Sequence, residues 1–141
     1  MNAGTGTAST ATITDVDVVH AVFGAFASGD LAALSDLLHA DATWQHHNDD
    51  RLGGIYRGAD SVIAYLTESA LLTAGTLHAE PQRVMADGQG HVAVRVRLSA
   101  SRPDGSTMDG PQAVLVTVAG GRVRAIEQFV GDPAAVAAFW A

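Results

Sequence analysis

Two kinds of hydrophobic spacing divide the sequence. In the first half, apolar residues recur every three or four positions, which is typical of helices that bury one face. Thr14 and Asp17 are spaced as a helix-capping box and predict a helix that ends at Gly29. Asp30 is suited to cap a second helix, and a third is predicted to begin after Gly58. The N-terminal half is therefore predicted to contribute three helices.

The second half shows the alternation that strands require. Apolar side chains at 92, 94, 96 and 98 lie on one predicted face, and Arg95 and Arg97 lie on the other. Four extended runs, separated by hairpin-type turns, cover residues 77–86, 91–101, 112–118 and 122–130. A further strand is predicted over 41–47, a polar loop over 48–54, and a short helix after Asp132 and Pro133. Helices followed by meandering strands predict an α+β domain with helices on one face of an antiparallel sheet.

Length and composition indicate a globular protein with one domain. The chain has 141 residues, of which 48% are hydrophobic, enough for one core without disulfides or metals. Residues 1–13 are small and uncharged, so we interpret them as a disordered tail ahead of a single domain over residues 14–141. Only 16% of residues are charged, which favours an apolar cavity or a surface covered by a partner.

The residue types exclude several classes of function. The chain has no cysteine and no lysine, which excludes thiolate chemistry, zinc–thiolate sites and lysine Schiff bases. A net charge of −7 disfavours nucleic acid and anionic membranes as partners. The sequence shows neither a secretory signal nor an apolar run long enough to span a membrane, so we predict a cytoplasmic protein. Arginine without lysine, with abundant alanine and glycine, also indicates a bacterial gene.

Four short motifs, in this order, resemble one known family. They are Ala-Ser-Gly-Asp at 27–30, Asp-Ala-Thr-Trp at 41–44, Tyr-Arg-Gly at 56–58, and Asp-Pro at 132–133 followed by Phe-Trp at 139–140. The chain from residue 14 to residue 141 thereby resembles the nuclear-transport-factor-2-like superfamily. Within it, the chain is most similar to the polyketide-cyclase-like (SnoaL-like) proteins, beside ketosteroid isomerase and limonene-epoxide hydrolase. The resemblance implies a cone-shaped roll, in which a curved antiparallel sheet wraps around three N-terminal helices and encloses an apolar pocket. It also implies a homodimer formed through the outer face of the sheet.

The resemblance also assigns positions to candidate catalytic residues. His46 falls at the position of the family's general base, and imidazole moves protons near neutral pH. Gln128 falls where several relatives carry a catalytic aspartate; its amide orients a carbonyl or a water but is not a base. A register shifted by one residue would instead turn Glu127 inward and restore the acid. Tyr65 aligns with an aromatic position of the pocket wall, where its phenol would either bind a ligand oxygen or serve packing alone.

Further residues are expected to contact a ligand. Trp44 shares a strand face with His46, and Tyr56 lies at the rim before the third helix. The alternation favours Arg95 and Arg97 outward, whereas a match to the epoxide hydrolase would turn them inward. The expected ligand contacts are Trp44, Tyr56, Val22, Phe26, Val94, Val96, Gln112 and Val114. The catalytic sets of the isomerase and of the hydrolase are both incomplete in this sequence, so neither activity is transferred.

These observations support one hypothesis and leave two alternatives open. The hypothesis is a cofactor-independent cyclase or isomerase that acts by general acid–base chemistry on a hydrophobic, oxygenated metabolite, polyketide- or steroid-like. Its central step is proton abstraction next to a carbonyl by His46. The alternatives are a non-catalytic ligand-binding or accessory protein on the same fold, and water addition to an epoxide with Glu127 inward. His46 and His47 are adjacent on a strand and point to opposite faces, so we expect no metal site.

Overall fold

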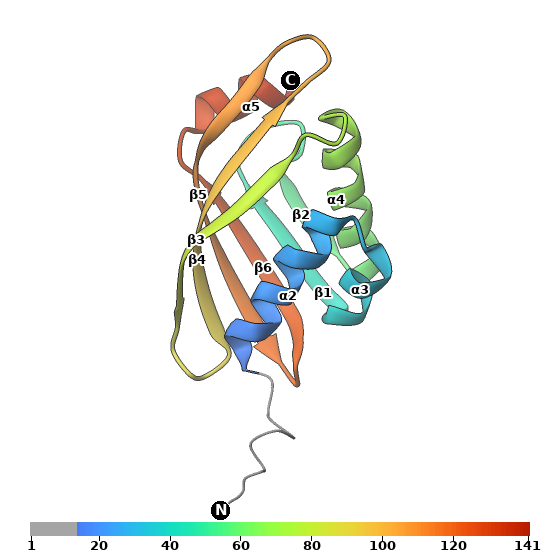
Figure 1. Cartoon of the computed structure of the whole chain (residues 1–141), viewed down its shortest axis with the longest axis vertical. Helices are drawn as coiled ribbons and strands as arrows, with labels where there is room; N and C mark the ends of the chain where they lie inside the picture. Colours follow the sequence, from blue (N-terminus) through green and yellow to red (C-terminus); the bar gives the residue numbers. More distant parts are fainter. Residues whose placement is uncertain (1–13) are drawn as a thin grey trace, which may run out of the picture.

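Helices and strands follow the order that the hydrophobic spacing predicts. The computed structural model describes residues 14–141 (Figure 1), so the predicted tail over residues 1–13 lies outside the described residues. The elements are α2 (Asp15–Ser28), α3 (Leu31–Leu37), β1 (Leu38–His47), β2 (Gly54–Arg57), α4 (Ala59–Leu72), β3 (His78–Ala86), β4 (His91–Ser101), β5 (Thr107–Ala119), β6 (Arg122–Val130) and α5 (Pro133–Trp140). The expected α+β fold is confirmed: within this range, four helices accompany one curved six-stranded sheet that stays open.

Local capping signals determine where α2 begins and ends and where α3 begins. The Thr14 hydroxyl accepts a hydrogen bond from the Asp17 amide at 3.1 Å, and the Asp17 carboxylate accepts one from the Thr14 amide at 3.3 Å. Gly29, with φ of 70°, ends α2, and the Asp30 carboxylate caps α3 through the Ala33 amide at 3.0 Å. The predicted capping box, stop and second cap are therefore confirmed. None of the helices described over residues 14–141 combines the length and the apolar character needed to cross a membrane.

The observed strand boundaries agree best with the predicted ones where a turn borders the strand at both ends. β4 and β6 match the prediction, whereas β5 begins at Thr107 rather than at residue 112, and β1 begins at Leu38 rather than at residue 41. The short strand β2 lies partly in the predicted polar loop and was not foreseen. Its four residues, Gly-Ile-Tyr-Arg, are too few to show a strand pattern, and the strand forms because β1 offers backbone partners, with Trp44 opposite Tyr56.

The strand order contains one parallel pair, which corrects the expected antiparallel sheet. The order is β2-β1-β6-β5-β4-β3, and β1 runs parallel to β6 while the other neighbours are antiparallel. In this register His46 lies opposite Gln128, and Trp44 lies opposite Ile126. Residues opposite each other point to the same face of a sheet, so this pairing brings candidates far apart in sequence together.

The two faces of the sheet differ in their side chains. Valines of β4 and β5 on the inner face are buried, and α2 and α4 lie over this face (Figure 1). On the outer face, Leu115 and Phe129 remain partly exposed. Arg95 and Arg97 are exposed there too, and the Arg97 guanidinium donates to both oxygens of Asp109 at 2.8 and 2.7 Å. Both arginines therefore point outward, and the homodimer through this face stays a prediction.

Candidate active site

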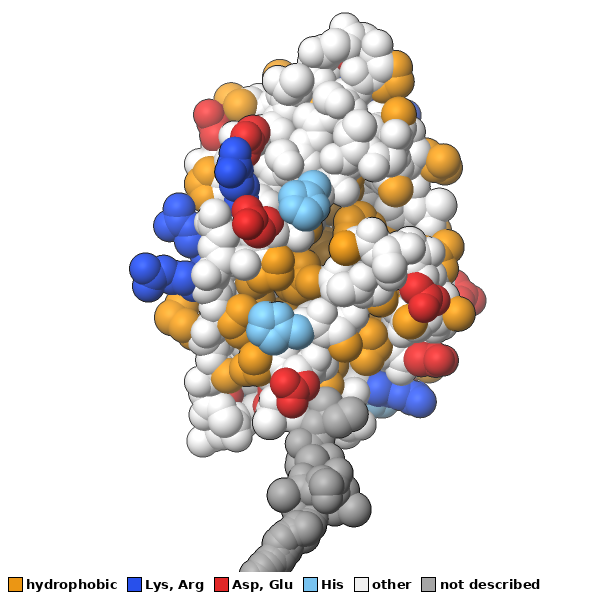
Figure 2. Space-filling view, viewed as in Figure 1, with side chains coloured by type: hydrophobic (Ala, Val, Ile, Leu, Met, Phe, Trp, Pro, Cys, Tyr) orange, Lys and Arg blue, Asp and Glu red, His pale blue; other side chains and the backbone are white. Residues whose placement is uncertain are grey.

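A small, largely apolar cavity lies between the inner face of the sheet and the helices. Its volume is about 80 Å³. Hydrophobic side chains are visible in a hollow near the middle of the face shown in Figure 2. The cavity is lined by Val19, Val22, Phe23, Phe26, Leu34, Trp44, Tyr65, Leu66, Ser69, Leu77, Ala79, Val96, Leu98, Gln112, Val114, Val116, Val123, Ile126, Gln128 and Trp140. Pockets for drug-sized ligands usually measure about 300–1,000 Å³, so a steroid-sized ligand requires the wall to move.

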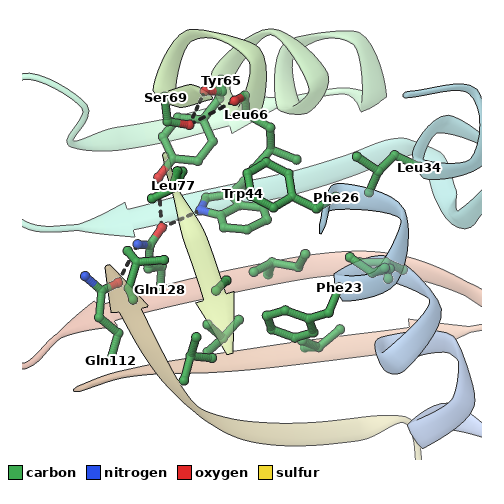
Figure 3. A pocket seen from close by; sticks show the side chains of 18 of the residues that line it. Phe23, Phe26, Leu34, Trp44, Tyr65, Leu66, Ser69, Leu77, Gln112 and Gln128 are labelled. Atoms are coloured by element: carbon green, nitrogen blue, oxygen red, sulfur yellow. Dashed lines mark hydrogen bonds between the residues drawn. The ribbon is translucent and has the colours of Figure 1, made fainter. Parts of the chain in front are cut away.

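The polar side chains gather at one end of this cavity (Figure 3). The Gln128 carbonyl oxygen accepts two hydrogen bonds, from the Trp44 indole nitrogen at 3.0 Å and from the Tyr65 hydroxyl at 2.8 Å. The Gln128 amide nitrogen donates to the Gln112 carbonyl oxygen at 2.6 Å. Ser69 instead donates to carbonyls of its own helix, including that of Tyr65 at 2.9 Å. Four side chains from β1, α4, β5 and β6 thus form one connected network.

His46 continues this network into the protein interior. Its Nδ1 atom lies 2.9 Å from the Tyr65 hydroxyl, and its Nε2 atom lies 2.9 Å from the Asp50 carboxylate. The side chains of His46 and Asp50 are 1% and 0% exposed. His46 is not among the residues that line the cavity. The expectation that the imidazole itself faces the cavity is therefore corrected: Tyr65 lies at the wall, and His46 lies one hydrogen bond behind it.

The loop after β1 holds Asp50 in place. One Asp50 oxygen accepts from the Leu52 amide at 2.8 Å, and the other accepts from the Asn48 side-chain amide at 2.7 Å in addition to contacting His46. The chain turns back so tightly here that a Cβ atom at Gly53 would clash with the Asn48 carbonyl oxygen. Glycine at this position lets the loop fold over the end of β1. The loop is therefore a scaffold for a buried carboxylate rather than only a polar connection.

With Asp50 as a carboxylate, which only accepts, the donors of this network allow two proton arrangements. Because the indole nitrogen of Trp44 only donates, the Gln128 atom that faces it is the carbonyl oxygen. If His46 carries both ring protons, it donates to Asp50 and to Tyr65, and the Tyr65 hydroxyl donates to Gln128. If His46 carries only the Nε2 proton, the Tyr65 hydroxyl donates to Nδ1 instead and keeps a lone pair on the Gln128 side. The two arrangements differ by one proton.

Burial keeps Tyr65 in its neutral form. Loss of solvation raises the pKa of the Tyr65 phenol above its ordinary value of 10.0, and the nearby Tyr56 and Asp50 raise it further. A phenol that stays protonated is a persistent hydrogen-bond donor. Desolvation also raises the pKa of Tyr56, whose hydroxyl donates to the Leu52 carbonyl at 2.8 Å.

We expect the raised pKa of Tyr65 to appear as a loss of stability in alkali. In the unfolded chain the phenol ionises near its ordinary pKa of 10.0, whereas in the folded protein it stays protonated. Below that pH, the contribution of Tyr65 to the free energy of unfolding should not change with pH. Above it, the free energy of unfolding should fall by up to about 1.4 kcal/mol per pH unit. Urea unfolding of wild type and Tyr65→Phe from neutral to alkaline pH measures the effect. The variant should show the shallower decline, and parallel curves would contradict the expectation.

The remaining predicted residues divide into those at the cavity and those away from it. The structure places Val22, Phe26, Trp44, Val96, Gln112 and Val114 in the wall. Tyr56 and Val94 are not in the wall; the Tyr56 ring instead packs on Tyr65, with centroids 4.4 Å apart. Glu127 points outward, where its carboxylate lies 2.9 Å from His47. Gln128, not Glu127, is therefore the inward residue, and the register that epoxide hydration requires is not formed.

Asp50 is the main site residue that the sequence interpretation missed. It lies in the segment predicted as a plain polar loop, four residues after His46. A spacing of four brings two side chains together on a helix but not on a strand. Because residues 41–47 were predicted as a strand and 48–54 as a loop, the spacing did not indicate a contact between His46 and Asp50. Ser69, Phe23, Leu77 and Trp140 were also not foreseen at the cavity.

Comparisons with known sequences identify relatives over most of the chain. The family model of the SnoaL-like domain matches residues 19–126. An uncharacterized protein of Mycobacterium bovis is 40% identical over 127 residues, which cover 90% of this chain and 96% of that protein. An uncharacterized protein of Mycobacterium tuberculosis matches with the same identity and coverage.

Solved structures with the same fold support this relationship. Bal32a, from a soil-derived mobile gene cassette, superposes with a TM-score of 0.87 at 26% sequence identity, over 90% of this chain and 96% of that chain. TerC, co-crystallized with polyporic acid, superposes with a TM-score of 0.77 at 19% identity, over 89% and 96% of the two chains. With the family match spanning most of the described residues, and as the sequence motifs predicted, the chain belongs to the SnoaL-like domain family.

Proposed function

We propose that this protein is an enzyme that moves a proton to or from a hydrophobic, oxygenated small molecule, in a cyclisation or an isomerisation. The observation that carries the proposal is the buried chain Asp50–His46–Tyr65, which ends at the wall of an apolar cavity. A titratable pair kept out of water behind a donor at the cavity is an arrangement suited to general acid–base catalysis. The proposal needs no cofactor.

The residues of the chain take distinct roles in the proposed step. With His46 neutral, the Tyr65 oxygen accepts a proton from a carbon next to the substrate carbonyl, while the hydroxyl proton of Tyr65 passes to His46 Nδ1. The C–H bond breaks, its electron pair moves to the carbonyl oxygen as an enolate, and the imidazolium forms beside Asp50. The reverse transfer returns the proton to another atom of the product. Because the two transfers are coupled, the buried phenol does not have to exist as a free anion.

Asp50 orients and stabilises the imidazole in this scheme. Its carboxylate faces Nε2, which keeps a proton on that atom and leaves Nδ1 to exchange with Tyr65. A buried carboxylate also favours the positive charge that His46 gains. Asp50 is thus a positioning residue. His46 is the final proton acceptor, and Tyr65 is the group that contacts the substrate.

The cavity wall supports an apolar substrate with few oxygen atoms. Most lining residues are aliphatic or aromatic, and the polar atoms are confined to one end. A fold relative, TerC, has been co-crystallized with polyporic acid. An oxygen atom at the polar end and hydrocarbon elsewhere would match this distribution.

Deuterium exchange into simple ketones tests the proposed function and does not require the natural substrate. Aryl ketones and cyclic enones are first screened for those that raise the melting temperature of the protein. Each ligand found is then incubated with the protein in D2O, and deuterium next to the carbonyl is measured by NMR. We expect exchange faster than in buffer alone.

A ligand-binding protein without turnover is the second candidate function. Among the described residues, no carboxylate and no imidazole lines the cavity directly, which favours binding alone. A ketone that stabilises the protein yet exchanges no faster than in buffer would support this candidate and contradict the enzyme.

A further inference from the structure

We propose that Trp44 and Tyr65 form a binding subsite for one carbonyl or carboxylate oxygen of the ligand, and that the Gln128 side chain occupies this subsite until the ligand displaces it. Gln128 is then an internal substitute for the ligand. The inference deepens the proposed function by naming the chemical group that is bound. While His46 carries both ring protons, the bound oxygen accepts from Trp44 and from Tyr65; when His46 is neutral, Trp44 alone holds it and the Tyr65 oxygen is free to take the substrate proton. It predicts a binding equilibrium, so it stands or falls separately from any turnover.

The geometry of the two donors carries this inference. The indole N–H of Trp44 and the hydroxyl of Tyr65 come from different elements, β1 and α4, and both reach the same oxygen atom, at 3.0 and 2.8 Å. Two donors that converge on one carbonyl oxygen in an apolar cavity form the arrangement that binds oxyanions and carbonyl groups. Figure 3 shows both bonds meeting at Gln128.

The donors are held more firmly than the acceptor. The Trp44 and Tyr65 rings pack together with centroids 5.3 Å apart, and Tyr65 is also packed by Tyr56 and hydrogen-bonded to His46. Gln128, in contrast, has a flexible side chain, and its remaining hydrogen bond goes to Gln112, another glutamine. The two carboxamides are therefore the part of the network best able to turn away.

The small size of the cavity also supports the displacement of Gln128 by a ligand. At about 80 Å³ it is too small for a substrate with rings, and the Gln128 side chain fills part of its polar end. Movement of this side chain would both enlarge the cavity and free two donors. Leaving those donors without an acceptor is unfavourable, so the exchange favours a ligand that supplies an oxygen to both.

The subsite selects ligands by hydrogen-bond role. With Gln128 moved away, it presents the indole N–H, which only donates, beside the Tyr65 hydroxyl. A ketone, an amide or a carboxylate supplies an sp² oxygen with two lone pairs, which match these donors. An ammonium group supplies only donors, so it leaves the indole N–H of Trp44 without an acceptor.

Chemical rescue of Gln128→Ala tests the subsite. The probe is acetamide, which replaces the lost carboxamide, and the readout is the indole N–H resonance of Trp44 in protein labelled with nitrogen-15. The resonance is assigned against Trp140, the other tryptophan of the chain, with Trp44→Phe. In Gln128→Ala this signal should move away from its hydrogen-bonded position. Acetamide should return it saturably, with an affinity at least about tenfold higher than for wild type.

Two controls isolate the role of Gln128. Gln112→Ala removes a carboxamide from the neighbouring strand but leaves Gln128 hydrogen-bonded to the two donors. The Trp44 signal of this variant should stay near that of wild type and should not change when acetamide is added. Ethylammonium, similar in size to acetamide but without an acceptor, should leave the Gln128→Ala signal unchanged. No return with acetamide, or an equal return with ethylammonium, would overturn the subsite.

The test does not depend on one variant folding. Gln128→Ser also withdraws the carbonyl oxygen and serves if Gln128→Ala unfolds. Wild-type protein gives an independent result: a bound ketone should shift the Trp44 indole signal and the Gln128 side-chain amide signals together. Binding in the cavity that leaves both sets of signals unchanged would contradict the displacement. The exchange assay in D2O decides the proposed function on its own.

Discussion

Replacing Asp50 with alanine is expected to lower the free energy of unfolding by about 3–5 kcal/mol. The carboxylate is fully buried and is contacted by three groups, the His46 ring, the Asn48 side chain and the Leu52 amide. Its removal leaves the Nε2 atom of His46 without a partner in the interior, where water does not reach, and a buried polar atom without a partner is costly. Urea unfolding monitored by circular dichroism measures the change.

The protein contains a matched control for this prediction. His47 and Glu127 form a second histidine–carboxylate pair, also with 2.9 Å between the atoms, but these side chains are 31% and 45% exposed. Glu127→Ala should therefore cost about 1 kcal/mol or less. Double-mutant cycles should give a large coupling energy for the buried pair and a small one for the exposed pair. Equal coupling energies would contradict the role given to burial.

Replacing Tyr65 with phenylalanine is expected to slow the deuterium exchange of a bound ketone by about 10²–10⁴-fold. The ring and its packing remain, while the hydroxyl that links the cavity to His46 is lost. His46→Gln should lower the exchange rate by a similar factor, because it removes the imidazole that accepts the proton from Tyr65. If the two residues act as one unit, the double variant should be no slower than the slower single variant.

His47→Gln is the control for the histidine. It removes an imidazole from the adjacent position of β1 but on the outer face, where its partner is Glu127. Exchange by this variant should stay close to that of wild type, and the melting temperature of each variant shows whether it is folded. A multiplicative loss in the double variant, or full activity of Tyr65→Phe, would contradict the coupled transfer.

Local sequence signals predicted most of the secondary structure. Helix starts were predicted well because a cap is a contact between residues three positions apart, as with Thr14 and Asp17 or with Asp30 and Ala33. β4 and β6 were placed correctly because turns rich in glycine border them. β2 was missed because its pairing depends on β1 and not on its own four residues.

The candidate site was predicted only in part. The family resemblance selected His46, Tyr65, Gln128 and Trp44, and the structure brings all four into one network. It also placed the imidazole at the wall of the pocket, whereas Tyr65 occupies that place. The carboxylate partner of His46 was missed, because the loop turns back only when Gly53 allows it to pack beside Asn48.

Local patterns in the sequence specified the α+β class, the caps of α2 and α3 and most strands, because these follow from side-chain periodicity and from contacts between near neighbours. They left open whether Gln128 or Glu127 faces inward on β6, which the strand pairing decided. Tertiary structure alone decided that β1 pairs in parallel with β6, that Asp50 lies against His46, and that two donors meet at Gln128. The hydrogen bond from Trp44 to Gln128, for example, joins residues 84 positions apart. The geometry of these contacts depends on strand register and loop closure, which no local pattern specifies.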